Sequence, residues 1–342
     1  MGISHDYEQI LKRLDVKDLI RCKSVCKSWH SLISTSDFIK THLNHSYINN
    51  EFRHRRIVVS RYGEPNKQYD SCFIVGSSNG LVCIKTSIAN VLVANPSSRE
   101  VKKLQTPWFP RWSSSLCWGF GYNLCKDDYK VILGVSNSGD DRTCFQMLEL
   151  ISNVWKDIGQ VEYTFISNVG ALYNGTLYWF MNDRKNNKNV ILSFDLSKEE
   201  FKEVSQPDDD VYNGCMDDNI SLSLGVVKEG LCIYESRLSP SSKKWVTENN
   251  SMWKLMKRDD NDDEMEERDV VHYLRPMRDY VPQKSFLSHI DVCSSKSGAY
   301  IGSPIFVQSL VSPHVNVNDR LPKRKRQKSE EDDNCRRVKV AL

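Results

Sequence analysis

A four-stranded pattern recurs from residue 57 to about residue 258 and constrains the fold more than any other feature of the chain. In each copy, two strands flank a turn with glycine, such as Asn174-Gly175, and two further strands flank a turn with serine. Asn-Gly between short runs of β-branched and aromatic residues is a strong hairpin signal. The serine turns at Ser97, Ser152, Ser197 and Ser241 recur at roughly the length of a propeller blade.

The predicted strand pairs therefore fall into similar units. One such unit cannot close its own edges, whereas radial repetition protects them. We expect an all-β domain over residues 57–312, built as a β-propeller of four-stranded units, with a large β-sandwich as the alternative. The predicted pairs are 72–75 with 81–84, 91–93 with 101–104, 145–150 with 155–158, 170–173 with 176–179, 191–194 with 201–204, and 224–227 with 231–234.

The first 44 residues follow a different rule, because their apolar residues recur at helical spacing. Asp15 with Asp18 resembles a capping box, and Ser24 and Ser36 are predicted N-caps of later helices. The turns are short, which predicts a compact helical cluster. The fold class is thus α+β multidomain: a helical module at 4–44, a linker at 45–56, the β domain at 57–312 and a disordered charged tail at 313–342. Within the β domain, residues 286–311 recover some strand character, for instance at 299–301 and 305–307.

The composition excludes several classes of protein. Lys and Arg total 47 and Asp and Glu total 44, so the net charge of +3 gives no general reason to expect binding to nucleic acid or a membrane. No apolar run approaches the ~20 residues of a membrane span, and no signal-peptide segment is visible. We expect a location in the nucleus or the cytoplasm, or both, with the 11 cysteines reduced.

Two motifs resemble catalytic or metal sites, but the sequence favours a simpler interpretation of each. Residues 76–80 match the Gly-x-Ser-x-Gly hydrolase elbow, yet a strand follows where that elbow needs a helix. Cys22, Cys26 and His30 share a predicted helical face, but the second half of a zinc motif is missing, and packing of Cys22 and Cys26 in the core is the favoured interpretation. We therefore predict no catalytic residue, no cofactor and no metal, and expect a protein that is not an enzyme.

The helical module resembles an F-box. Residues 10–21 read ILKRLDVKDLIR, residues 25–33 read VCKSWHSLI, and Phe38 follows, which matches the ordered pattern of that family over residues 7–43. Two positions depart from the pattern. The initial Leu-Pro segment is missing, so the first helix is expected to be truncated, and Asp15 stands where the family has proline.

The β region resembles the F-box-associated interaction domain of the large plant family, which is kelch-like. The matching segments are SNGLVC at 78–83, NPSSR at 95–99, GFGY at 119–122, DDYKV at 127–131, WKDI at 155–158, GALYNG at 170–175 and FDL at 194–196.

The resemblance implies a substrate-recognition adaptor of an SCF-type cullin ubiquitin ligase. Its F-box would dock a Skp-type adaptor and, through it, a cullin scaffold, while its β domain would bind a protein substrate. The alternative is a stand-alone β-propeller interaction module with a degenerate F-box. The residues implied in adaptor binding are Ile10, Leu11, Leu14, Val16, Leu19, Ile20, Val25, Cys26, Lys27 and Trp29.

Two further features bear on binding and location. Trp108, Trp112 and Trp118 are candidate anchors for a substrate, although Trp118 is better explained as core between blades. A basic cluster in the tail is typical of a nuclear-import signal, with a merely solvating charged tail as the alternative. Its residues are Lys323, Arg324, Lys325, Arg326 and Lys328.

Overall fold

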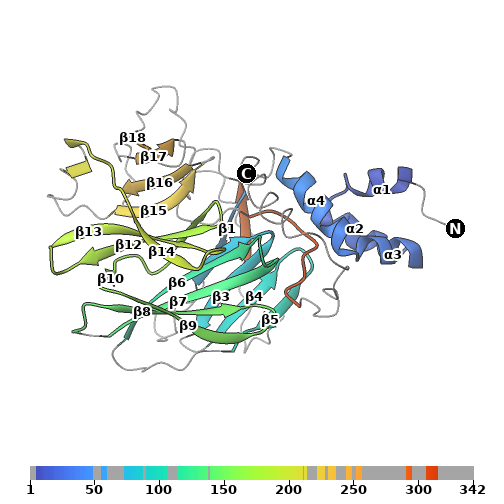
Figure 1. Cartoon of the computed structure of the whole chain (residues 1–342). Helices are drawn as coiled ribbons and strands as arrows, with labels where there is room; N and C mark the ends of the chain where they lie inside the picture. Colours follow the sequence, from blue (N-terminus) through green and yellow to red (C-terminus); the bar gives the residue numbers. More distant parts are fainter. Residues whose placement is uncertain are drawn as a thin grey trace, which may run out of the picture. The chain divides into compact units, whose positions relative to one another are not determined.

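The computed structural model divides the chain into two compact units (Figure 1). One unit contains the four helices, the first β-sheet, a pair of strands from distant parts of the chain, and residues 306–314. The other contains three further sheets. The residues described are 5–48, 55–59, 73–87, 90–105, 114–137, 139–210, 212–213, 222–227, 230–235, 244–248, 252–255, 290–294 and 306–314.

Four helices form the N-terminal module, as the helical spacing predicts. Each contributes at least one buried apolar side chain to a common core, in which Leu11, Leu19, Ile33 and Phe38 are at most 2% exposed. The helices are α1 His5–Leu11, α2 Val16–Cys22, α3 Lys27–Ile33 and α4 Ser36–Ile48.

Two predicted helix caps are wrong. Ser24 is not the N-cap of α3, because that helix begins at Lys27. Its N-cap is Cys26, whose Sγ accepts a hydrogen bond from the Trp29 N–H at 3.5 Å. Ser36 is already inside α4, and the hydroxyl of Thr35 accepts the Phe38 N–H at 3.2 Å. Cysteine is an uncommon cap, and threonine directly before serine makes the boundary ambiguous by one residue.

The capping box predicted at α2 does not form. Asp15 is the N-cap of the helix, with an extended backbone (φ −62°, ψ 151°), but its side chain makes no capping hydrogen bond. Asp18 instead accepts a hydrogen bond from Arg21 at 2.8 Å on the exposed side of α2. Asp15 therefore marks the start of the helix through its backbone alone.

Most strands of the β region form antiparallel sheets in which neighbouring strands follow one another along the chain. The first sheet is β2 Phe73–Ser78, β3 Leu81–Ser87, β4 Asn90–Asn95 and β5 Glu100–Lys103. The second is β6 Ser114–Asn123, β7 Asp128–Asn137, β8 Thr143–Glu149 and β9 Val154–Val161. The third joins β12 Thr176–Asp183, β13 Lys188–Asp195 and β14 Glu200–Val204 to the short strands β10 Thr164–Phe165 and β11 Ala171–Tyr173. The fourth is β15 Leu222–Val227, β16 Gly230–Glu235, β17 Lys244–Glu248 and β18 Met252–Leu255.

These sheets confirm the predicted four-stranded unit. Each predicted strand pair is present, and the turns at Ser97, Ser152 and Ser197 fall between the strands expected, whereas Ser241 lies outside the described residues. Asn174 (φ 47°) and Gly175 (φ 71°) both occupy the left-handed region that a tight hairpin requires.

The second and third sheets share a core within their unit. Trp179 of β12, Phe145 of β8 and Met147 of the same strand are buried together there. Two tryptophans on outer strands also make corresponding hydrogen bonds. The Trp155 indole N–H donates to the Gln105 carbonyl at 2.6 Å, and the Trp253 indole N–H donates to the Ser205 carbonyl at 2.7 Å. In each case the last strand of a sheet is bonded to a residue that precedes the first strand of the same sheet in the chain.

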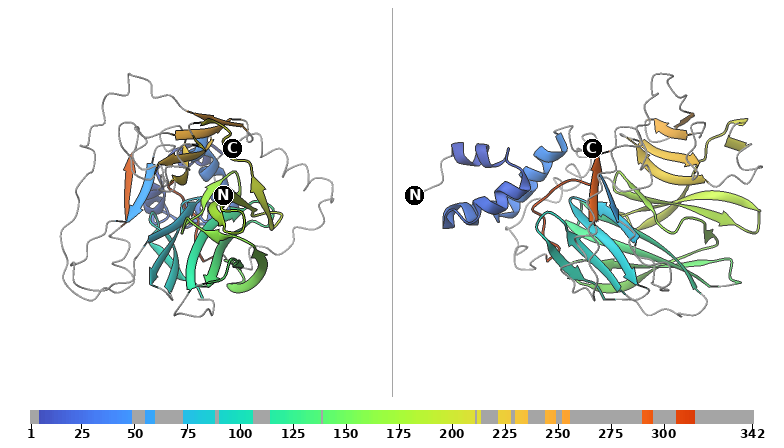
Figure 2. Two further views of the ribbon diagram at one scale, coloured as in Figure 1. Left: turned by 90° about the vertical axis from the view of Figure 1, so that its left-hand side faces the viewer. Right: turned by 180° about the vertical axis from the view of Figure 1, so that it is seen from behind.

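The C-terminal part of the β domain agrees with expectation in one place. β19 Ile290–Ser294 lies within the stretch of strand character predicted at 286–311, and it pairs antiparallel with β1 Arg55–Val59 in the views of Figure 2. Residues 299–301 lie outside the described residues. The strand predicted at 305–307 is wrong, because Phe306 and Val307 lie in a segment without strand structure. Apolar character reflected burial rather than pairing, since both side chains are at most 4% exposed.

Candidate docking surface on the helical module

Several large apolar side chains of the helical module remain uncovered. Tyr7 and Ile10 lie three residues apart on α1 and are 51% and 58% exposed, and Val25 is 66% exposed just before α3. Trp29 of α3 is half-buried, and its ring centroid is 6.2 Å from that of Tyr7. This contact connects the apolar side chains of α1 to those of α3. Together Tyr7, Ile10, Val25 and Trp29 are called the apolar surface below.

The ten residues implied in adaptor binding fall into three groups. Three are buried in the core of the module and can support a surface only by holding the helices: Leu11, Val16 and Leu19. Three are half-buried and pack against that core: Leu14, Ile20 and Trp29. Four are exposed and available for contact: Ile10, Val25, Cys26 and Lys27.

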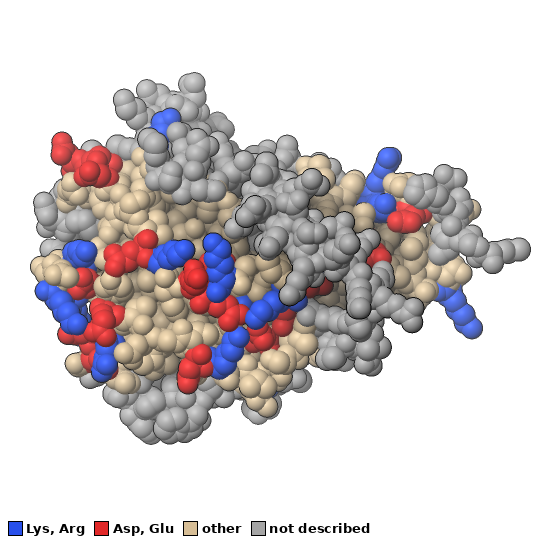
Figure 3. Space-filling view, in the orientation of Figure 1, with Lys and Arg blue, Asp and Glu red and all other residues tan. Residues whose placement is uncertain are grey.

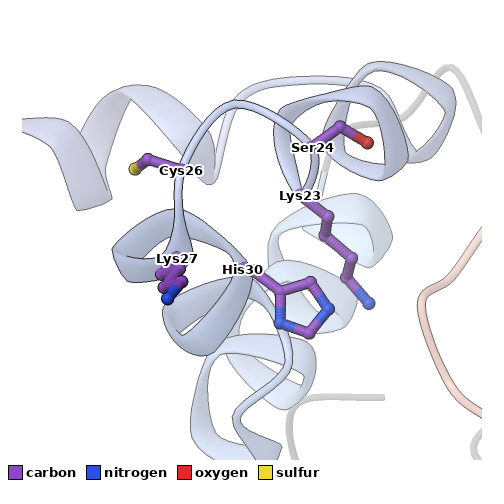
Figure 4. A pocket seen from close by; sticks show the side chains of 5 residues that line it. All are labelled: Lys23, Ser24, Cys26, Lys27 and His30. Atoms are coloured by element: carbon purple, nitrogen blue, oxygen red, sulfur yellow. The ribbon is translucent and has the colours of Figure 1, made fainter.

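A hollow on the helical module carries basic side chains (Figure 4). It is lined by Lys23, Ser24, Cys26, Lys27 and His30, from the end of α2 and the first turns of α3. No acidic side chain lines it. The hollow is therefore suited to an acidic group of a partner.

The sequence did not single out Tyr7, Lys23 or His30 as contact residues. Tyr7 could have been found, because it precedes Ile10 by three residues and so shares a helix face with it. Lys23 and His30 come together only through the turn between α2 and α3.

One buried histidine helps to fix the helices. The ring of His42 on α4 makes a 2.9 Å hydrogen bond with the Leu14 carbonyl through Nε2. Burial lowers the pKa of His42, so the neutral ring is favoured at this position. The bond connects α4 to the turn before α2.

The two decoy motifs have structural roles in the described chain. Cys26 is exposed and its Sγ caps α3, so the predicted core packing of Cys26 is wrong, whereas Cys22 is half-buried and packs against the core of the helical module. In the described part of the chain, no group of three His, Cys, Asp or Glu is placed to hold a metal. In the Gly-x-Ser-x-Gly match, β2 ends at Ser78 and β3 begins at Leu81, so strands lie on both sides of the turn. The hydrolase elbow would need a helix there.

The β-sheets offer less guidance about a binding site. Trp118 is fully buried, as the core interpretation predicts, and Trp108 and Trp112 lie outside the described residues. On the face shown in Figure 3, acidic and basic side chains are interspersed rather than separated. Among the described helices, none has the length and apolar character that a membrane span needs.

Comparison with known proteins identifies both parts of the chain. The family model for the F-box domain matches residues 7–41, and the model for the F-box associated beta propeller domain matches residues 30–281. The predicted fold, a helical F-box followed by a β-propeller, is thereby confirmed, and the four larger sheets among the described residues supply its blades.

Curated plant proteins are similar over much of the chain. The F-box protein CPR1 of Arabidopsis thaliana is 30% identical over 268 residues, which is 66% of this chain and 64% of that protein. The putative F-box protein At3g10430 of the same plant is 31% identical over 60% of this chain and 62% of its own length. The F-box/kelch-repeat protein At3g23880, also of Arabidopsis thaliana, is 27% identical over 58% and 64%. The chain thus spans less than two thirds of the length of these relatives.

Proposed function

Because the chain belongs to the family that joins an F-box domain to an F-box associated beta propeller domain, we propose that it is a non-catalytic substrate-recognition adaptor of an SCF-type cullin ubiquitin ligase. The helical module docks a Skp-type adaptor, which connects it to a cullin scaffold. The β-propeller holds a protein substrate on a rigid framework.

The apolar surface is the observation that carries this proposal. Ile10 and Val25 are more than half exposed, although each belongs to a module with its own apolar core. Large apolar side chains that a small module leaves exposed are typical of a surface that a partner covers. The basic hollow adds a charge preference, so the expected partner has an apolar groove bordered by acidic groups.

We expect the double variant Ile10→Asp, Val25→Asp to lose capture of a Skp-type adaptor and its cullin. Both side chains are exposed, so the charges disturb the contact surface rather than the core. Because two apolar anchors are lost, we expect the dissociation constant for the adaptor to rise at least about 100-fold. The measurement is titration of purified adaptor against the full chain, with circular dichroism to verify folding.

Two matched variants control for the added charge. Ile48→Asp alters an apolar residue of α4 that is 75% exposed, and Val154→Asp alters one on β9 that is 60% exposed. Both should keep normal adaptor binding. Leu19 is unsuitable for the test because it is fully buried, so a charge there would unfold the module. Unchanged adaptor binding by the Ile10→Asp, Val25→Asp variant would contradict the docking proposal.

The same experiment addresses the alternative of a stand-alone interaction module with a degenerate F-box. That alternative draws on Asp15, which stands where the F-box pattern has proline. If the unaltered chain fails to capture the adaptor, the alternative is favoured. Since Asp15 still begins α2 through its backbone, we expect capture to succeed.

We further propose that the tail directs nuclear import. The basic cluster of residues 323–328 lies outside the described residues, so its support is the sequence alone. Deletion of 323–328 should shift a fluorescent fusion of the full chain from the nucleus to the cytoplasm. A distribution equal to that of the unaltered fusion would favour the solvated-tail interpretation.

A further inference from the structure

Residues 306–314, called the strap below, contribute to two cores of the first unit. Phe306 is 1% exposed and packs with Val82, Ile84 and Ala94 of the first sheet. Leu310 is 6% exposed and belongs to the core of the helical module. The strap therefore links the F-box to the first blade over four residues of chain (Figure 1).

Asn95, at the end of β4, holds the middle of the strap. Its amide Nδ2 donates to the Ser309 carbonyl at 2.9 Å and to the Val311 carbonyl at 2.7 Å. Its Oδ1 accepts the Ser97 N–H at 2.8 Å and so shapes the turn into β5. The side chain is completely buried, and it is satisfied at both ends.

The turn between β2 and β3 accepts hydrogen bonds from both the strap and helix α4. The Ser309 hydroxyl donates to the Asn79 carbonyl at 2.7 Å, and the Tyr47 hydroxyl of α4 donates to the Asn79 Oδ1 at 3.0 Å. Burial raises the pKa of Tyr47 to about 12, so this phenol stays a donor across the physiological range. A Cβ added at Gly80 would lie 2.7 Å from the Val307 carbonyl oxygen and would also collide with Ser309.

The third sheet has turns of the same kind and serves as an internal comparison. Asp195 ends β13 as Asn95 ends β4, and its Oδ1 accepts the Ser197 N–H at 2.9 Å, but a carboxylate has no N–H to donate. Gly175 has a φ of +71°, close to the +80° of Gly80, yet an added Cβ there would meet nothing within 4 Å. The amide donors at 95 and the crowding at Gly80 are therefore features of the first sheet that the corresponding turns of the third sheet lack.

We propose that the strap fixes the position of the F-box module on the first blade and keeps the helices of that module ordered. Leu310 completes the helical core, while Asn95 and the Asn79 turn hold the strap in place. A partner bound to the helices is thereby carried at a fixed position relative to the first blade. The inference does not depend on which partner that is.

The test is Asn95→Asp in the full chain, followed by amide hydrogen exchange without any partner. Aspartate keeps the turn, as Asp195 shows, but it removes both donors to the strap and sets a negative charge against two carbonyls. Exchange in α2–α4 and the strap should become at least about tenfold faster, while β12 and β13 remain unchanged. Asp195→Asn is the matched control and should leave the strap and helices protected.

A second pair of variants tests the proposal independently in case Asn95→Asp fails to fold. Gly80→Ala and Gly175→Ala carry the same backbone strain, but only the first crowds the strap. Gly80→Ala should therefore accelerate exchange in the helices by about tenfold more than Gly175→Ala does. Acceleration confined to the altered turns, or equal effects within either pair, would overturn the proposal. Adaptor binding is not measured in these experiments, so their failure is distinct from failure of the docking proposal.

Discussion

Trp179→Ala is expected to lower the free energy of unfolding of the β region by about 3–5 kcal/mol. Trp179 is fully buried on β12, and its ring centroid is 5.8 Å from that of Phe145 in the second sheet. Its indole N–H donates to the Trp118 carbonyl at 3.0 Å. The substitution removes apolar contact between two sheets and also a buried hydrogen bond, so both losses act together.

The backbone near Trp179 already lies against the indole ring, and it has no side chain there that could move into the space that alanine would leave. A Cβ added at Gly119 would lie 2.7 Å from the Trp179 ring, and one added at Gly170 would lie 2.6 Å from it. These glycines admit the indole because they have no side chain, and they cannot fill a cavity in its place. The cost should therefore lie toward the upper end of the expected range.

Denaturant unfolding followed by circular dichroism provides the measurement, with Trp155→Ala as the matched control. Trp155 also donates its indole N–H to a carbonyl, that of Gln105, but the ring is only half-buried on an outer strand. Its removal should cost no more than about 1.5 kcal/mol. If the two variants are equally destabilised, Trp179 does not anchor the contact between the sheets.

The features that the sequence predicts well are those that depend on neighbouring residues. Asn174-Gly175 specifies its hairpin because both residues tolerate positive φ, and the strands on each side need no distant information. The helical spacing of apolar residues likewise predicts the short helices of the F-box, which pack around a common core. The hydrophobic pattern and turn chemistry thus determine the repeat and the module.

The features that the sequence did not reveal depend on residues far apart in the chain. Leu310 completes the core of helices that begin some three hundred residues earlier, and no local pattern indicates this. Asn95 resembles an ordinary turn residue, and its amide acquires a second role only when Ser309 lies beside it. Exposure of Ile10 and Val25 also depends on the packing of α1 against α3, which periodicity alone does not fix.

A buried lysine in the second sheet is a further long-range feature. Lys130 of β7 is fully buried, and its ammonium donates to the Leu196 carbonyl and, at 2.7 Å, to Glu199 Oε1. Lys126 and Lys156 also donate to Glu199, at 2.7 and 3.1 Å. One carboxylate therefore serves three lysines within the unit that holds the second and third sheets.

This arrangement shifts the pKa of both partners. Burial of Glu199 would raise its pKa, but hydrogen bonds from Lys126, Lys130 and Lys156 outweigh that effect and lower the pKa to about 2. Burial lowers the pKa of Lys130, and the bond to Glu199 opposes the change. The ammonium of Lys130 therefore needs the carboxylate of Glu199 close by.

Glu199→Gln is expected to destabilise the protein by about 3 kcal/mol at neutral pH. A carboxyl whose pKa is lower in the folded state than its ordinary 4.5 contributes stability that is complete above about pH 5 and is lost as the pH falls toward 2. The difference in unfolding free energy between the unaltered chain and Glu199→Gln should shrink over that interval. Urea unfolding at several pH values measures it, and a difference that is independent of pH would contradict the assignment.

The reverse substitution should be much milder. Lys130→Met removes the buried cation itself, and Lys126 and Lys156 continue to pair with Glu199, so no charge is left without a partner in the interior. Glu199→Gln instead leaves the Lys130 ammonium buried against a carbonyl and an amide. Lys130→Met should therefore cost less than about half as much, and Lys130→Met combined with Glu199→Gln should be more stable than Glu199→Gln alone. Equal costs for the two single variants would show that the carboxylate, rather than the stranded lysine, determines the loss.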